Sequence, residues 1–273
     1  MFYNKWMTRI LALCNQKGGV GKSTSSQNLA VFLAALGRNV LVVDLDPQAN
    51  TTSGFGANPR RLKKSIYDVL IDRASAREAI QHTSILSVDL LPSAPALAGA
   101  AIELIDMPHR EFKLKEVLDE VRHNYDFIII DSPPSVGLLT INALTAAQKI
   151  IIPVQCEYYA LEGLADLLST IQFVNVNLKS KVAIMGALLT MYDRTSKLHR
   201  AVAKEVRRRF PGYVFEAVIP RNVSLAEAPS FGKTILQYDP YSHGAKAYRQ
   251  FAEEVLKLEK MSVGYRHRSH NYS

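Results

Sequence analysis

The segment Lys-Gly-Gly-Val-Gly-Lys-Ser-Thr at residues 17–24 is the feature that most constrains the fold of this chain. It follows a short apolar run at residues 9–14 (RILALC) and precedes an expected helix at residues 23–36. Glycines in such a turn let backbone N–H groups converge on phosphate oxygens, and the helix N-terminus adds positive potential. In this context Lys22 is expected to reach the β- and γ-phosphates, and the Ser23 hydroxyl to bind Mg²⁺. The segment therefore predicts a phosphate-binding loop between a first buried strand and a first helix.

This loop departs from the usual G-x-x-x-x-G-K-[ST] pattern at one end. Gln16 occupies the position of the first glycine, and Lys17 adds a second lysine five residues before Lys22. A glycine-rich turn alone is weak evidence for phosphate binding. Its position between a strand and a helix makes a purely structural turn the weaker interpretation.

Short apolar runs alternate with helical patterns along the rest of the chain. Expected strands lie at residues 9–14, 40–45, 85–91, 127–130, 150–154, 182–189 and 214–219, and expected helices at 23–36, 96–105, 111–123, 161–177 and 244–260. Residues 47–61 read as a loop, and Ser65 with Asp68 opens a short helix in capping-box style. The alternation predicts an α/β fold: a mostly parallel, twisted sheet with helices on both faces, of the P-loop NTPase type. We expect one domain of this type at residues 8–260 with flexible termini at 1–7 and 261–273, and either Met1 or Met7 as the start.

Three carboxylates stand at the expected carboxyl ends of strands. Asp44 and Asp46 alternate at the end of one strand, which predicts that both leave the same face of the sheet, and Asp131 follows the apolar run 127–130. Taken alone, each of these aspartates is also compatible with a purely structural role, capping the loop at the end of its strand. Together, beside a phosphate loop, they favour a site for Mg²⁺ and phosphoryl transfer, because ligands of open α/β sheets bind at that edge.

The net charge of +8 is concentrated in the last third of the chain. Residues 1–180 carry 17 basic and 17 acidic side chains, whereas residues 181–273 carry 16 and 8. Within an expected helix at residues 196–210, Leu198, Val202, Val206 and Phe210 form an apolar stripe. Cations occupy the neighbouring face and its flanking loops: Arg194, Lys197, Arg200, Lys204, Arg207, Arg208 and Arg221. No helix-turn-helix or zinc-finger pattern accompanies them, so the expected contact is with DNA phosphates, with little sequence information. A merely solvated helix face remains the alternative.

Six motifs together resemble the ParA/Soj family of chromosome- and plasmid-partition ATPases and, more distantly, its MinD relatives. They are KGGVGKST, DLDPQAN, DSPPS, PVQCEYYALEG, TMYDR and VIPRNVSLAEAPSFGKTI, and the match covers residues 8–259. The resemblance implies a sandwich homodimer that forms with ATP and Mg²⁺, binds double-stranded DNA non-specifically, and is reset by hydrolysis. It also implies a weak intrinsic ATPase rate, a ParB-type activator protein as partner, and a cytoplasmic, nucleoid-associated protein.

The resemblance also implies roles for individual residues. Lys17 falls on the family's signature lysine, which crosses the dimer interface to the other subunit's nucleotide. Asp46 matches the carboxylate that positions the attacking water, and Asp131 matches the aspartate linked to Mg²⁺ through water, beside Ser23. The implied catalytic residues are Lys17, Lys22, Asp46 and Asp131. The implied nucleotide contacts are Lys17, Gly18, Gly19, Val20, Gly21, Lys22, Ser23, Thr24 and, around the adenine, Pro220 and Asn222. Arg194 and Arg221 match family positions that contribute to DNA binding.

Three other functions stay open from the sequence. A MinD-like ATPase that cycles on a membrane needs an amphipathic C-terminal helix, which Glu253, Glu254 and Glu259 disfavour. No apolar run approaches the roughly 20 residues of a membrane span, so we expect no membrane contact. A nucleotide-gated DNA scaffold or regulator with negligible hydrolysis is the second alternative, and a metabolic ligase or small-molecule kinase is the third. Cys14 and Cys156 lack any metal-binding spacing and are expected to be packing residues.

Overall fold

The protein is built on one continuous sheet. The computed structural model describes residues 7–158 and 162–268, and within them the sheet has eight strands in the order β3-β4-β2-β5-β1-β6-β7-β8. The strands are β1 (Arg9–Leu13), β2 (Val40–Asp44), β3 (Gln81–His82), β4 (Val88–Leu91), β5 (Phe127–Asp131), β6 (Lys149–Gln155), β7 (Ala183–Tyr192) and β8 (Val214–Pro220). All neighbours pair in parallel except β3 and β4, which are antiparallel. The expected α/β fold with a mostly parallel sheet is confirmed.

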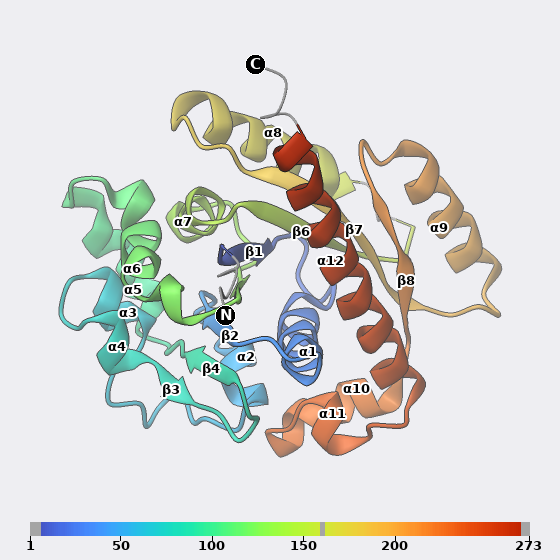
Figure 1. Ribbon diagram of the computed structural model, residues 1–273, viewed down its shortest axis with the longest axis horizontal. Coiled ribbons are helices and arrows are strands. Elements are labelled where there is room, and N and C mark those ends of the chain that lie inside the picture. The colour runs from blue at the N-terminus through green and yellow to red at the C-terminus, as the bar shows by residue number, and fades with distance from the viewer. Residues whose placement is uncertain (1–6, 159–161, 269–273) are drawn as a thin grey trace.

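Helices cover both faces of the sheet (Figure 1). They are α1 (Lys22–Ala35), α2 (Asn50–Gly54), α3 (Ile66–Leu70), α4 (Ala76–Ala79), α5 (Leu97–Glu103), α6 (Lys113–Val121), α7 (Leu138–Ala146), α8 (Glu162–Asn177), α9 (Lys197–Arg209), α10 (Val223–Glu227), α11 (Ile235–Tyr238) and α12 (His243–Arg268). In β1, Ile10 and Ala12 face the layer formed by α3 to α9, whereas Leu11 and Leu13 face α1 and α12. This alternation follows from the two-residue repeat of a strand, and it explains why strands buried on both faces appear as continuous apolar runs.

The order of the strands places a crevice at one edge of the sheet. β1 and β5 lie side by side, with Leu13 opposite Asp131. β1 is followed by α1 on one face, and β5 by α7 on the other. Where successive helices leave for opposite faces, the carboxyl ends of the strands open to a ligand. The phosphate loop and Asp131 both lie at this point.

The structure corrects several details of the secondary structure. Residues 47–61, expected as a loop, contain α2, whose Thr51 and Thr52 are buried. Helix α7 was not expected because it is apolar nearly all round and has no amphipathic repeat. The two-residue strand β3 was also missed, and α12 continues past the expected end at residue 260 to Arg268. The capping box of Ser65 and Asp68 at the start of α3 is confirmed.

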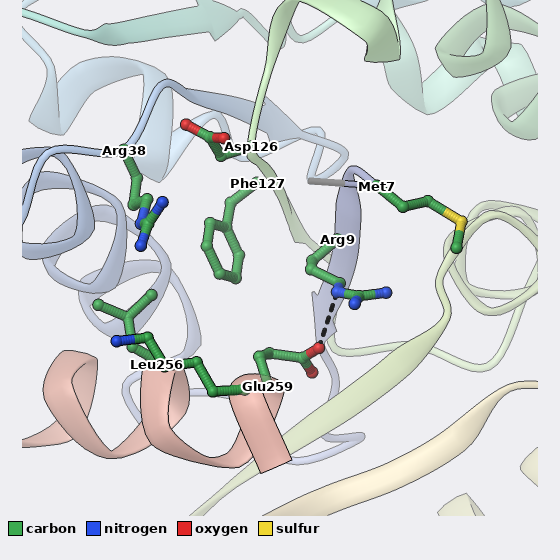
Figure 2. Close-up of a pocket in the computed structure, with 8 residues that line it drawn as sticks. Met7, Arg9, Arg38, Asp126, Phe127, Leu256 and Glu259 are labelled. Carbon is green, nitrogen blue, oxygen red and sulfur yellow. Dashed lines mark ion pairs between the residues drawn. The ribbon is translucent and has the colours of Figure 1, made fainter. Parts of the chain in front are cut away.

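Helix α12 is tied to the sheet by a buried carboxylate. Glu259, 3% exposed, lies against Arg9 of β1, with Oε2 3.0 Å from the guanidinium Nε (Figure 2). Lys149 of β6 approaches Oε1 of the same carboxylate at 2.7 Å. One carboxylate therefore joins the last helix to the first residues of two neighbouring strands.

Replacing Glu259 by Ala is expected to destabilise the fold strongly. Removing one partner of a buried ion pair leaves the other charges desolvated, which typically costs about 3–5 kcal/mol. Urea unfolding followed by circular dichroism measures the loss, with the exposed Glu253→Ala variant of the same helix as the control. A change in the unfolding free energy as small as that of Glu253→Ala would contradict the structural role.

Candidate nucleotide site

The phosphate loop forms a tight turn that only glycine accommodates without strain at two positions. Gly19 and Gly21 have φ angles of +73° and +86°, in the left-handed region. Gly21 is the N-cap of α1, and no side chain caps the helix. The first N–H groups of α1 are therefore directed towards the pocket without a protein side chain to accept them, which is the arrangement that binds an anion.

An open pocket of about 600 Å³ lies over this turn. Its wall includes Gly18, Gly19, Gly21, Lys22, Ser23 and Thr24 from the loop and the start of α1, and Asp46 from the segment after β2. The structure thus brings seven of the predicted site residues together. The loop, the helix start and a carboxylate at one pocket are the elements that triphosphate binding requires.

Lys22 is buried and points back over the loop. The residue is 6% exposed, and its Nζ donates a hydrogen bond to the Lys17 carbonyl oxygen at 3.1 Å. Burial lowers the pKa of the Lys22 amine, and the nearby carboxylates of Asp131 and Asp46 act in the opposite direction. An amine held in this position can contact the negatively charged oxygens of a phosphate bound in the loop.

Lys17 lies apart from the pocket of its own subunit. Its side chain is 39% exposed, and Nζ lies 3.7 Å from Oε2 of Glu157, the second residue after β6. Lys17 is not part of the pocket wall, although its neighbours Gly18 and Gly19 are. The two lysines of the loop therefore differ: Lys22 lines the pocket of its own subunit, whereas Lys17 lies at its rim.

The three carboxylates separate into different roles. Asp46 is 6% exposed, lines the pocket, and accepts a hydrogen bond from the Gln48 N–H through Oδ1 at 2.9 Å. Asp44 is fully buried, and its Oδ2 accepts two hydrogen bonds of 2.7 Å from the N–H and hydroxyl of Thr52. Asp44 therefore anchors α2 and does not line the pocket.

Asp131 lies beneath the loop, fully buried. Its Oδ2 accepts a hydrogen bond from the Thr51 hydroxyl at 2.7 Å. Burial raises the pKa of Asp131, whereas hydrogen bonds from the hydroxyls of Ser23 and Thr51 act against this rise. A buried carboxylate beside the Ser23 hydroxyl is a pair of hard oxygen donors, and this suits Mg²⁺ that keeps several waters and a phosphate ligand.

Several pocket residues were missed by the sequence analysis. Gln27, Gln48, Asn50, Ser53, Pro134, Met191, Pro229 and Ser230 complete the wall. The polar run that contains Gln48 and Asn50 directly follows Asp46, and this position was the available signal. The other missed residues lie on segments that only tertiary packing brings close to the loop.

Pro220 and Asn222 lie at the carboxyl end of β8, outside the residues that line this pocket. Asn222 is the N-cap of α10, where its Oδ1 accepts a hydrogen bond from the Leu225 N–H at 3.0 Å. Its expected contact with adenine stays a prediction.

The predicted DNA-binding cations are all exposed, but their surroundings differ. Arg208 forms a bidentate pair with Glu205, at 2.8 Å to each oxygen. Arg200 donates to the Arg194 carbonyl oxygen at 2.6 Å, and Arg207 to that of Phe215 at 3.3 Å. Within the described ranges, Arg194, Lys197 and Lys204 have no ion-pair partner. The apolar stripe is correct at Val206 and Phe210, which are buried, whereas Leu198 is 46% exposed.

The two cysteines are buried, as expected for packing residues. Burial raises the pKa of both thiols to about 11. Within residues 7–158 and 162–268, no three His, Cys, Asp or Glu side chains are grouped so as to hold a metal by themselves.

Comparisons with known proteins show what this chain is similar to. A family model described as an AAA domain matches residues 8–184. The chain is 51% identical over 249 residues to the sporulation initiation inhibitor protein Soj of Bacillus subtilis, covering 91% of this chain and 98% of that protein. It is 44% identical to the chromosome partitioning protein ParA of Caulobacter vibrioides, covering 92% and 95%.

A solved structure is also similar. It is a cobyrinic acid a,c-diamide synthase from Mycobacterium smegmatis with bound ADP and magnesium, 38% identical, with a TM-score of 0.83 and coverage of 93% of this chain and 96% of that one. The same protein has been solved with an ATP analogue and magnesium. The expectation of ATP and Mg²⁺ agrees with these ligands.

The fold and the site define a P-loop ATPase with a second lysine in its phosphate loop. Both curated relatives are matched over almost their full lengths. The chain belongs to the ParA/Soj family of partition ATPases.

Proposed function

We propose that this protein partitions chromosomal or plasmid DNA by an ATP-driven cycle. Two subunits bind ATP and Mg²⁺, pair face to face, and hold DNA without sequence preference until a ParB-type partner stimulates hydrolysis. Soj and ParA, the relatives described above, carry partitioning or regulatory names. The observation that carries the proposal is the position of Lys17, half-exposed at the rim and outside its own pocket.

A lysine in this position suits work on a neighbouring nucleotide. Stabilising charge on the phosphoryl oxygens is the main catalytic task in phosphoryl transfer, and a cation supplied by another subunit has a large effect there. Lys22 supplies charge within the subunit and Lys17 supplies it in trans. The complete site then exists only in a dimer, so that ATP promotes pairing and hydrolysis reverses it.

Strand β7 connects the nucleotide pocket to the basic surface. The Thr190 hydroxyl donates to the Val20 carbonyl oxygen of the loop at 2.9 Å, and Met191 lines the pocket. The chain then passes through Arg194 into α9 with Lys197 and Lys204. A surface of this kind supplies phosphate contacts on each subunit, and pairing two such surfaces increases residence on DNA through avidity.

Lys197→Ala with Lys204→Ala is expected to weaken ATP-dependent DNA binding and to lower the log–log salt slope by about 2 for each bound subunit. Arg208→Ala should change both the DNA affinity and the salt slope less, because Glu205 already pairs with that guanidinium. Anisotropy of a labelled duplex of arbitrary sequence, measured without nucleotide, with ADP and with ATP across a salt series, tests both statements.

The matched control is Lys115→Ala with Lys181→Ala, which removes the same charge from a hollow beside the first residues of β6. An equal loss of affinity in the control would contradict the assignment of the surface. Absence of ATP-dependent DNA binding in the unmodified protein would contradict the function itself.

The alternatives are distinguished by direct measurements. No helix in the described parts of the chain is long and apolar enough to cross a membrane. Co-sedimentation with liposomes tests surface attachment of the MinD type. Multiple-turnover release of phosphate, with DNA and partner present, separates an ATPase from a scaffold with negligible hydrolysis. One solved relative is named a cobyrinic acid a,c-diamide synthase, so a metabolic amide ligase is the second candidate function. An assay for ATP-dependent amidation of cobyrinic acid tests this candidate.

A further inference from the structure

Glu157 lies between two cations to which the proposed function assigns different tasks. Its Oε2 is 3.7 Å from Lys17 Nζ, and its Oε1 is 3.8 Å from Nη2 of Arg221. Lys17 belongs to the phosphate loop and Arg221 directly follows β8. One carboxylate thus links the rim of the nucleotide site to a residue predicted to contact DNA.

The sheet defines where this carboxylate stands. The Cys156 N–H donates to the Thr190 carbonyl oxygen at 3.1 Å, and the Arg221 N–H donates to that of Tyr192 at 3.0 Å, so the ends of β6 and β8 are both joined to β7. The Gln155 side chain donates to Oε1 of Glu157 at 2.5 Å and orients the carboxylate. The arrangement is therefore built into three strand ends.

We propose that Glu157 is a positioning residue that restrains both Lys17 and Arg221 in the nucleotide-free subunit. The inference rests on the function proposed above. Lys17 must leave Glu157 to reach the nucleotide of a second subunit, and Arg221 must leave it to meet a DNA phosphate. Glu157 therefore opposes pairing and DNA binding together, and it weakens DNA binding by the unpaired, nucleotide-free protein.

The restraint is weak enough to be reversed by the ligands. The side chains of Lys17, Glu157 and Arg221 are 39%, 42% and 64% exposed, so solvent screens both pairs. An exposed ion pair changes an equilibrium by up to about fivefold. A triphosphate or a row of DNA phosphates presents more charge than one carboxylate and displaces it.

The first test measures DNA binding by the nucleotide-free protein. Glu157→Gln is expected to bind a labelled 30-base-pair duplex about two- to fivefold more tightly at low salt. Glu216→Gln is the matched control, because it removes the same charge from an exposed position on β8 without touching Lys17 or Arg221. In an Arg221→Ala background, Glu157→Gln should give no gain, and this is a result that a general structural effect would not produce.

The second test measures pairing. With a non-hydrolysable ATP analogue, the protein concentration at half-dimerisation in analytical ultracentrifugation should fall about two- to fivefold for Glu157→Gln. ATP affinity of the single subunit should stay the same. The inference is overturned if Glu157→Gln behaves like Glu216→Gln, if its gain persists without Arg221, or if pairing weakens. An unmodified protein that neither pairs with the analogue nor binds DNA would instead overturn the proposed function, and the inference with it.

Discussion

Lys17→Gln is expected to abolish ATP-dependent pairing and to lower the partner-stimulated rate of ATP hydrolysis by about 10³–10⁵-fold, the range for a cation supplied in trans. The Lys17 amine stands at the rim, 3.7 Å from Glu157, and contributes nothing to the wall of its own pocket. Gln keeps a polar side chain, one atom shorter than that of Lys, but removes the charge. ATP binding to a single subunit should therefore persist, because Lys22 and the N-terminus of α1 remain.

Sedimentation with an ATP analogue measures the pairing, and released phosphate measures the rate. Lys17→Arg is the companion variant, since it keeps the positive charge and should retain part of the pairing. Mixing Lys17→Gln with a hydrolysis-deficient subunit that retains Lys17 should restore turnover in one of the two sites. Unchanged pairing together with an unchanged rate in Lys17→Gln would refute the role in trans.

Asp46→Asn should lower the hydrolysis rate by about 10²–10⁴-fold, as expected for loss of a group that orients or deprotonates an attacking water. Asp46 is the carboxylate that lines the pocket, and its Oδ1 is held by the Gln48 N–H. Asparagine preserves the shape and one acceptor oxygen. The nucleotide-bound dimer should consequently form and persist, with a longer residence on DNA.

Single-turnover hydrolysis and the dissociation rate from a DNA-coated surface measure these two effects. Asp44→Asn is the informative comparison, because Asp44 is buried and holds Thr52 of α2 without lining the pocket. It should lower thermal stability more than Asp46→Asn does. Loss of ATP binding in Asp46→Asn would show that the carboxylate serves binding and not the chemical step.

Much of the fold followed from local chemistry. The alternation of apolar runs and helical repeats predicted seven of the eight strands, and the capping box of Ser65 and Asp68 predicted α3. The missing strand, β3, has two residues, lies at the edge of the sheet and pairs with β4. Such a short segment carries no two-residue repeat long enough to recognise.

Helices α7 and α2 show where local patterns fail. In α7, Thr140, Asn142 and Thr145 are buried as well as Leu139 and Leu144, because the helix packs between the sheet and α6. The Asn142 side chain accepts a hydrogen bond from the Leu114 N–H at 2.9 Å. In α2, Thr51 and Thr52 are held by Asp131 and Asp44. These helices are stabilised by distant partners, which no local repeat reveals.

What the sequence determined by itself was the phosphate loop, the α/β fold, the seven exposed cations and the family, since each rests on residues adjacent in the chain or on a regular repeat. Tertiary structure alone decided which carboxylate faces the pocket, which cations are already paired, and that Glu157 reaches both Lys17 and Arg221. The physical reason is that hydrogen bonds and ion pairs act over a few ångströms in space. The sheet brings β6, β7 and β8 together from separate parts of the chain, and their order cannot be read from any one segment.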